Sequence, residues 1–455
     1  MDVTIMLEGP TGESTAVPTT IPHWYDPDSD ALAITDGDGT TVVDETGTTY
    51  LDFVSQLYCV NAGHGNRTII DGMTEQLEQI QYVSAAKRSP VRAALGERLV
   101  DLAPASLSHA LFSVTGSEAN ELAVQLARNH TGASKVLTRW RSYHGSTYGA
   151  GSLTGDPETR NLVETHAATT GAAKFLPPMA HRSPFDAETP AELADAAADH
   201  LEFVIRNEGP DSIAAIMMEP VAGSSGAYTA PSGYFERVRE LCDEYEILLI
   251  ADEVITGFGR CGEWFGIETE GVEPDLLTFA KGVTSSYAPL AGVLARPELV
   301  ADIEQEGFDL GQTFGGHPVS CAAGLAAIEA YDNGLIENAR ENAPALETGL
   351  AELASRTDVV ADVRGRGYLR AVEFADPATG EPFYDPRVDD TDGDENADEP
   401  ENPVPAVAAA LEDRGVIVGT GRPATQLLLA PPLCATATEI ETALTELEAA
   451  IDEVF

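Results

Sequence analysis

Short, largely apolar runs alternate with helical segments from about residue 65 to about residue 325. The clearest runs lie at 111–114, 135–138, 213–218, 247–251, 276–280 and 290–295. Short apolar runs without polar alternation, separated by helices, are typical of strands buried on both faces of a mainly parallel sheet. We therefore predict an α/β arrangement for this part of the chain.

The two ends of the chain follow different patterns. Residues 1–60 are rich in turn-forming residues, with short strand candidates at 40–43 and 48–51. Pro318 is expected in the first turn of a helix that begins after residue 317. Beyond it we expect helices at about 339–355, 404–414 and 437–453, and strands at about 368–374 and 426–430. This mixture predicts a separate, smaller α+β unit.

A strongly acidic segment, 381–403, interrupts that unit and is expected to be an exposed, mobile insertion. Four of its carboxylates fall at the spacing of a calcium-binding loop: Asp390, Asp392, Asp394 and Glu401. However, Glu395 occupies the position that needs glycine for the sharp turn, and Pro400 precedes the closing glutamate. A solvated acidic loop is therefore favoured over a metal site.

The charge balance changes the picture of the partners. The chain has 75 acidic and 26 basic residues, a formal net charge of −49. This excess argues against nucleic acid or an anionic membrane as a partner. Because the acids are spread along the whole length and lysine is scarce, we expect adaptation to a salty cytoplasm, as in a halophile. The alternative is an ordinary acidic protein.

The cysteines and the apolar content indicate a cytoplasmic location. Five cysteines form no CxxC pair, and we expect them to be small buried residues in a reducing compartment: Cys59, Cys242, Cys261, Cys321 and Cys434. The opening MDVTIMLEGPTGES lacks a basic segment before an apolar one, so no signal peptide is expected. No apolar stretch approaches the length that spans a membrane.

Lys281 is the most unusual candidate for chemistry. The chain has only four lysines, and this one follows the apolar run 276–280. Burial at a strand end lowers the pKa of an amine, and a neutral amine is a nucleophile that can form a Schiff base. The alternative is a lysine that extends its amine to solvent.

Three further candidates also follow predicted strands. Gly116 and Ser117 begin a helix, where free N–H groups bind phosphate or the serine serves only as a cap. Asp252 suits a protonated pyridine nitrogen, or else a buried ion pair. Tyr143 and His144 suit stacking on a flat ring, or else ordinary core packing. Because ligands of such sheets bind at the carboxyl ends of strands, we expect these side chains to meet Lys281.

A set of motifs in order resembles the class III aminotransferases. The motifs are SVTGSEANELAVQLAR, YHGS, MEPVAG, ADEVITGFGRCG, LLTFAKGV, TFGGHPVSCAAG and VRGRGYLRAVEF. The resemblance covers roughly residues 30–450 and implies pyridoxal phosphate as the cofactor and fold type I. That fold has a large domain with a mainly parallel seven-stranded sheet, here 65–325. Its smaller α+β domain would come from both termini, 1–64 and 326–455.

The resemblance also implies roles around the cofactor ring. Lys281 would hold pyridoxal phosphate as a Schiff base and then move the proton of the substrate. Asp252 would pair with the pyridine nitrogen. Val254 would pack on one face of the ring, and Tyr143 would stack on the other with His144 beside it.

Further roles implied by the resemblance concern the phosphate and the neighbouring subunit. Gly116 and Ser117 would bind the phosphate. Thr313, in the TFGGHP motif, would reach a phosphate of the neighbouring subunit, which makes the enzyme a homodimer or a higher assembly such as a tetramer. Glu219 would lie near the 3′ oxygen of the cofactor and the substrate side.

Two residues bear on the substrates. Tyr58 lies in 55–65, which resembles the pocket lining of the branch that acts on ω-amino acids or on amines with pyruvate; alternatively it is a core residue. Arg422 lies before the PPL motif, near the position of an arginine that clamps the carboxylate of the acceptor, although the spacing differs by about one residue. We therefore expect transfer from an ω-amine or ω-amino acid to pyruvate or another 2-oxo acid. An aminomutase or decarboxylase of the same fold, and a non-catalytic binding module, remain alternatives.

Overall fold

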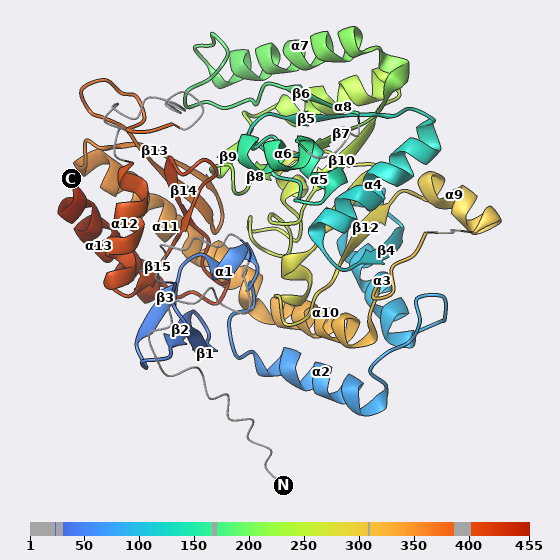
Figure 1. Cartoon of the computed structure of the whole chain (residues 1–455), viewed down its shortest axis with the longest axis horizontal. Coiled ribbons are helices and arrows are strands. Elements are labelled where there is room, and N and C mark those ends of the chain that lie inside the picture. The colour runs from blue at the N-terminus through green and yellow to red at the C-terminus, as the bar shows by residue number, and fades with distance from the viewer. Residues whose placement is uncertain (1–22, 24–30, 166–170, 308–309, 386–401) are drawn as a thin grey trace.

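A seven-stranded sheet forms the centre of the protein in this computed structural model, which describes residues 23, 31–165, 171–307, 310–385 and 402–455 (Figure 1). The strands pair in the order β4 (His109–Ser113), β12 (Ala291–Ala295), β11 (Leu276–Phe279), β10 (Leu248–Asp252), β7 (Ile213–Met218), β5 (Lys135–Arg139) and β6 (Ala172–Phe175). Strand β12 runs in the direction opposite to that of the other six strands of this sheet. The predicted α/β fold, with a mainly parallel seven-stranded sheet of fold type I, is therefore confirmed.

Both faces of this sheet are covered by helices. Ile250 of β10 packs in a hydrophobic cluster with residues of α4 (Gly116–Thr131), whereas its neighbours Leu249 and Ala251 pack in the main core. Successive side chains of a strand point to opposite faces, so the two clusters lie on opposite sides of the sheet. The apolar runs lack polar alternation because each strand is buried on both faces.

The helices of this part of the chain follow the strands in sequence. Their bounds are α2 (Arg67–Gln79), α3 (Pro90–Leu102), α5 (Tyr148–Leu153), α6 (Pro157–Glu164), α7 (Pro190–Glu208), α8 (Tyr234–Tyr245), α9 (Pro297–Glu306) and α10 (Pro318–Ala330). Pro318 lies in the first turn of α10, as predicted. Helix α10, which follows the last strand of the large sheet in the sequence, packs against α2 and α3, which precede its first strand.

The N-terminal and C-terminal parts of the chain combine in smaller sheets beside the large one. Strand β3 (Thr49–Asp52) pairs with the C-terminal β15 (Val416–Ile417), so blue and red elements meet in Figure 1. The other elements are β1 (Ile34–Asp38), β2 (Thr41–Asp44), α1 (Ser55–Tyr58), β8 (Val221–Ala222), β9 (Tyr228–Thr229), α11 (Ile336–Arg356), β13 (Val360–Arg366), β14 (Leu369–Phe374), α12 (Pro403–Asp413), β16 (Gly419–Thr420), β17 (Gln426–Leu429) and α13 (Ala437–Val454). The division of the chain at residues 64 and 325 stays a prediction.

Three expectations from the sequence have different outcomes here. None of the five cysteines forms a disulfide; Cys242, Cys261 and Cys321 are buried as expected, whereas Cys59 and Cys434 are only partly buried. The calcium-loop spacing and most of the acidic segment 381–403 fall in 386–401, outside the described residues. Within the described residues, no helix combines the length and the apolar content needed to cross a membrane.

Candidate active site

A cavity of about 820 Å³ lies where β10 and β11 end. All of the site residues predicted from the sequence line it except Thr313: Tyr58, Gly116, Ser117, Tyr143, His144, Glu219, Asp252, Val254, Lys281 and Arg422. These residues lie at or near the ends of different strands, some of the large sheet and some of the smaller sheets. The fold therefore brings the four predicted strand-end signals together, as expected for the carboxyl edge of a parallel sheet.

Lys281 lies two residues beyond the end of β11, at the start of a short 3₁₀ turn (Lys281–Thr284). Its φ of +47° is in the left-handed region, which costs a residue other than glycine about 1–3 kcal/mol. Desolvation lowers the pKa of its amine, although Cys59 and the carboxylates of Asp252 and Glu219 oppose this shift. The Nζ atom lies 5.7 Å from the centre of the Tyr58 ring. The amine is thus prepared to act as a nucleophile or a base.

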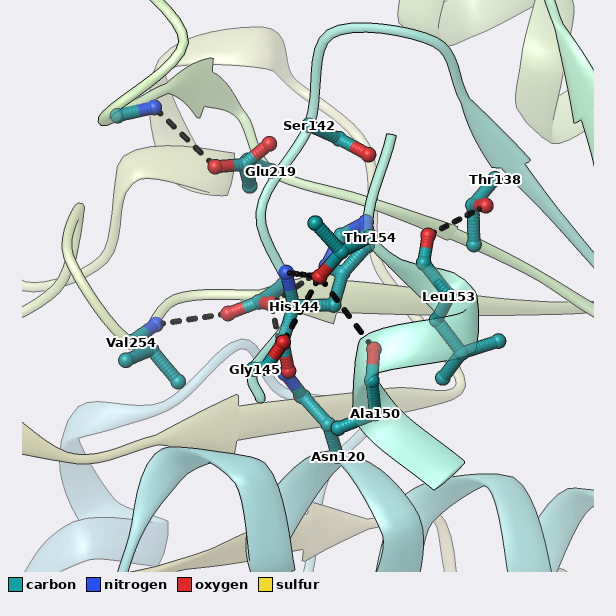
Figure 2. Close-up of polar contacts among 12 residues, drawn as sticks. Asn120, Thr138, Ser142, His144, Gly145, Ala150, Leu153, Thr154, Glu219 and Val254 are labelled. Carbon is teal, nitrogen blue, oxygen red and sulfur yellow. Dashed lines mark hydrogen bonds and ion pairs between the residues drawn. The ribbon is translucent and has the colours of Figure 1, made fainter. Parts of the chain in front are cut away.

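Asp252 is the last residue of β10 and is almost completely buried. One oxygen, Oδ2, accepts a hydrogen bond from Asn120 Nδ2 at 2.8 Å and pairs with His144 Nδ1 at 2.7 Å. The other, Oδ1, accepts from the backbone N–H of Val254 at 3.1 Å (Figure 2). Three fixed partners hold the carboxylate in one orientation, which suits a group that must face a ring nitrogen.

Asn120 was not predicted from the sequence, although it orients both Asp252 and the loop of His144. Its Nδ2 also donates to the backbone oxygen of His144 at 2.7 Å. It lies four residues after Gly116 on α4, in line with the buried Ala123 and Ala127. A polar residue on the apolar face of a helix needs a partner, and that spacing is the signal that could have identified it.

The start of α4 provides a place for an anion. Thr115 and Glu118 form a capping box that binds the backbone N–H groups of Val114, Thr115 and Glu118. The N–H groups of Gly116 and Ser117 take no part in this box. A Cβ at residue 116 would lie 2.9 Å from Val254 Cγ1, so only glycine leaves the space open there. Helix N-termini of this kind bind phosphate.

Glu219 is buried beside the cavity and pairs with Arg139. The Oε2 atom of Glu219 lies 3.6 Å from Arg139 Nη2, and Oε1 accepts from the backbone N–H of Gly223 at 3.2 Å. Burial raises the pKa of the Glu219 carboxyl, while the charges of His144 and Arg139 oppose this shift. This carboxyl can therefore hold or accept a proton close to the cavity.

The cavity lining also contains an arginine and two aromatic rings, Arg422, Tyr58 and Tyr143. The guanidinium of Arg422 lies 5.9 Å from the centre of the Tyr143 ring, and its Nη1 is 3.5 Å from Thr159 Oγ1 on α6. Burial raises the pKa of Tyr58, so this ring stays a neutral phenol. A cation and apolar ring faces thus share one chamber.

Thr313 is the one predicted residue that lies away from the cavity. Its side chain is exposed, and its backbone oxygen accepts a hydrogen bond from Tyr82 at 3.0 Å. The next residue, Phe314, is 57% exposed. Its predicted contact with a neighbouring subunit cannot be made inside one chain and stays a prediction.

The cavity fits pyridoxal phosphate. Four residues that line it each carry a buried polar atom without a hydrogen-bond partner among the described residues: Asn120 Oδ1, His144 Nε2, Glu219 Oε2 and Ser224 Oγ. Such atoms need partners from a bound group. The cavity also offers an amine for the aldehyde, a carboxylate for the ring nitrogen and a helix N-terminus for the phosphate. The fold and these groups define a pyridoxal-phosphate enzyme of fold type I.

Comparison with known proteins leads to the family. The sequence profile of aminotransferase class-III matches residues 24–451. The taurine–pyruvate aminotransferase of Bilophila wadsworthia is 34% identical over 88% of this chain and 86% of its own. The diaminobutyrate–2-oxoglutarate transaminase of Halomonas elongata is 33% identical over 94% of this chain and 91% of its own. The chain therefore belongs to the class III aminotransferases, and its cofactor is pyridoxal phosphate.

A solved structure gives the same result for the fold. The taurine:2-oxoglutarate aminotransferase of Bifidobacterium kashiwanohense, in complex with pyridoxal phosphate and glutamate, matches with a TM-score of 0.88. The two proteins are 32% identical, and the match covers 95% of this chain and 95% of the other. The resemblance found in the sequence motifs is thus confirmed at the level of family, fold and cofactor.

Proposed function

We propose that this aminotransferase takes amino groups from ω-amines or ω-amino acids and passes them to pyruvate or another 2-oxo acid. The observation that carries the proposal is that one cavity holds the Lys281 amine, the Tyr58 ring and the Arg422 guanidinium. An apolar wall suits the body of an amine donor, and a guanidinium suits the carboxylate of the acceptor. The names of two relatives support the proposal. The Bilophila protein is named for taurine and pyruvate, and the Halomonas protein for diaminobutyrate and 2-oxoglutarate.

The residues around the cofactor would divide the work as follows. When bound, pyridoxal phosphate supplies an aldehyde and an electron-withdrawing ring. The Lys281 amine would accept the proton from the substrate carbon at Nζ and would then deliver it to the carbon of the cofactor's aldehyde group. The carboxylate of Asp252 would keep the ring nitrogen protonated. Val254 and Tyr143 would fix the plane of the ring.

Four further residues would complete the cofactor site. The backbone N–H groups of Gly116 and Ser117, with the Ser117 hydroxyl, would hold the phosphate. Glu219, whose pKa is raised by burial, would hold a proton near the 3′ oxygen. His144 would brace Asp252 through the 2.7 Å contact at Nδ1.

A donor and acceptor screen tests the proposed reaction. Purified enzyme loaded with pyridoxal phosphate is mixed with ω-amino acids, diamines or aryl amines, and with pyruvate or 2-oxoglutarate. We expect one new amino acid for each donor consumed, and no reaction without an acceptor. Carbon dioxide release or an isomer without acceptor would instead indicate a decarboxylase or an aminomutase. Failure of every donor despite bound cofactor would favour a non-catalytic binding module.

Replacing Arg422 with alanine tests the proposed carboxylate clamp. We expect the KM for pyruvate to rise by about 10- to 100-fold, because a charge-assisted hydrogen bond is lost. The KM for an amine donor without a carboxylate should stay within about threefold of wild type, since such a donor does not need the guanidinium. Arg237→Ala is the control, because that arginine is an exposed residue of α8. An unchanged KM for pyruvate would contradict the clamp.

We also propose that the working enzyme is a homodimer or a tetramer in which Thr313 reaches the phosphate of the neighbouring subunit. The exposure of Thr313 and of the apolar Phe314 beside it supports this proposal. Sedimentation equilibrium of the loaded enzyme should give at least twice the mass of one chain. A monomer that remains fully active would contradict it.

A salt-adapted cytoplasmic enzyme is the remaining part of the proposal. The net charge of −49 makes the folded state self-repulsive, and salt screens that repulsion. We expect the unfolding midpoint temperature to rise by roughly 10 °C or more between about 0.1 M and about 2 M KCl. Differential scanning calorimetry measures this shift. A midpoint that is equally high in dilute buffer would contradict salt adaptation.

A further inference from the structure

Lys174, on the edge strand β6, is a second lysine whose amine is enclosed by protein. Its Nζ donates hydrogen bonds to Thr138 Oγ1 at 2.6 Å, to the backbone oxygen of Ser152 at 3.2 Å and to the backbone oxygen of Leu153. Three acceptors match the three protons of an ammonium group. Desolvation lowers the pKa of Lys174 to about 7, with Arg160 adding to the shift and Glu164 opposing it.

Two of these acceptors are the last carbonyls of α5, the short helix that follows the Tyr143–His144 loop. The final carbonyls of a helix have no partner within the helix. A helix of six residues has little stability of its own, so external bonds decide where it lies. Thr138 on β5 adds a second bond to the oxygen of Leu153, at 2.8 Å (Figure 2). The amine therefore joins the end of α5 to β5 and β6.

The same end of α5 is bonded to the loop that lines the cavity. Thr154, directly after the helix, accepts a hydrogen bond from the backbone N–H of His144 at 2.9 Å. Its hydroxyl also donates to the backbone oxygen of Gly145 at 3.0 Å (Figure 2). His144 in turn pairs with Asp252 through Nδ1. A continuous set of contacts thus leads from the edge strand to the carboxylate of the site.

We infer that Lys174 is a positioning residue, which holds the Tyr143–His144 loop against the cofactor by anchoring the end of α5. This inference rests on the cofactor and residue roles proposed above. Without the ammonium group, the backbone oxygens of Ser152 and Leu153 lose their hydrogen bonds to β6, and α5 can shift. The loop would then hold the ring less firmly, so cofactor would bind more weakly.

The chain contains a matched control for this lysine. Lys135, on the adjacent strand β5, donates from Nζ to the backbone oxygen of Glu208 at 2.7 Å and pairs with its carboxylate at 2.8 Å. Glu208 is the last residue of α7, and no residue of that helix lines the cavity. Lys135→Met therefore removes a lysine of similar chemistry at a helix end, but one without a link to His144.

The test measures the dissociation constant of pyridoxal 5′-phosphate from each folded variant, together with the circular dichroism of the bound cofactor. We expect Lys174→Met to weaken binding by about tenfold and to reduce the cofactor dichroism. Lys135→Met should bind cofactor within about twofold of wild type. If Lys174→Met does not fold, Lys174→Gln, which keeps two donor protons, takes its place.

A double-mutant cycle with Thr154→Val distinguishes positioning from general destabilisation. Thr154→Val removes the hydrogen bonds that join the end of α5 to the loop of His144, which belong to the same set of contacts. Its effect on cofactor binding should therefore not add to that of Lys174→Met. Its effect should add to that of Lys135→Met. Wild-type binding by Lys174→Met, equal weakening by Lys135→Met, or full additivity with Thr154→Val would overturn the inference.

The wild-type protein separates this inference from the proposed function. Wild type must bind the cofactor covalently at Lys281, detected by borohydride reduction and peptide mass, and must transaminate. If it does neither, the proposed function fails. If it does both while Lys174→Met binds cofactor normally, only the role of Lys174 fails.

Discussion

Lys281→Ala is expected to lower the rate of transamination by about ten-thousandfold, the upper end of the range for loss of a positioned acid–base group. The amine at this position combines a lowered pKa with a backbone held at φ +47° at the end of β11. No other described lysine lines the cavity. Single-turnover kinetics with a donor amine and pyruvate measure the loss.

Lys87→Ala is the matched control for this change, because Lys87 is exposed and does not line the cavity. It should keep full activity. Lys281→Ala should also lose the covalent link to the cofactor, so dialysis should remove pyridoxal phosphate from the variant and not from wild type. Full activity in Lys281→Ala would show that a different group moves the proton.

Asp252→Asn is expected to reduce kcat by about a thousandfold, the scale of removing a preorganised charge from a buried site. A neutral amide cannot keep a ring nitrogen protonated, so the ring would withdraw electrons less strongly. The change also replaces the carboxylate that Asn120 and His144 contact with an amide. Steady-state kinetics under saturating donor and acceptor measure the effect.

Glu253→Gln provides the control from the next residue in the chain. Glu253 is fully buried, but its carboxyl accepts from the backbone N–H groups of Gly266 and Ile267 and lies outside the cavity lining. Burial raises its pKa to about 7, so a neutral amide resembles one of its own forms. Its kcat should stay within about threefold of wild type. A similar loss in both variants would mean that Asp252 acts only through folding.

Strands were predictable from the sequence where they are apolar on both faces. A strand was missed where one of its residues is polar and forms hydrogen bonds with a helix distant in the sequence. The run at 213–218 matches β7, and the run at 276–280 contains all of β11 and one residue more. Strand β6 was not predicted, because its four residues include Lys174, whose partners come from α5 and β5. In the sequence alone, a lysine within a short apolar run argues against a buried strand, because its hydrogen-bond partners are not known.

The candidate site was predictable as a set of strand ends, but not in its connections. Gly116, Asp252 and Lys281 each stand next to an apolar run, so their common edge follows from a parallel sheet. Asn120 stands inside a helix, and its link to Asp252 joins positions 132 residues apart. No local pattern specifies a contact at that separation, because the register and twist of the sheet decide it.

The apolar runs by themselves determined the fold class, because burial on two faces and a helix start after a strand leave local patterns. The resemblance of the ordered motifs to the class III aminotransferases indicated the family and the cofactor. Only the tertiary structure decided which polar groups meet. It placed Asn120 and His144 on one carboxylate, set Arg422 over Tyr143, and enclosed Lys174 at the end of α5. These pairings depend on how separate strands and helices pack, and hydrogen-bond geometry tolerates errors of only a few tenths of an ångström.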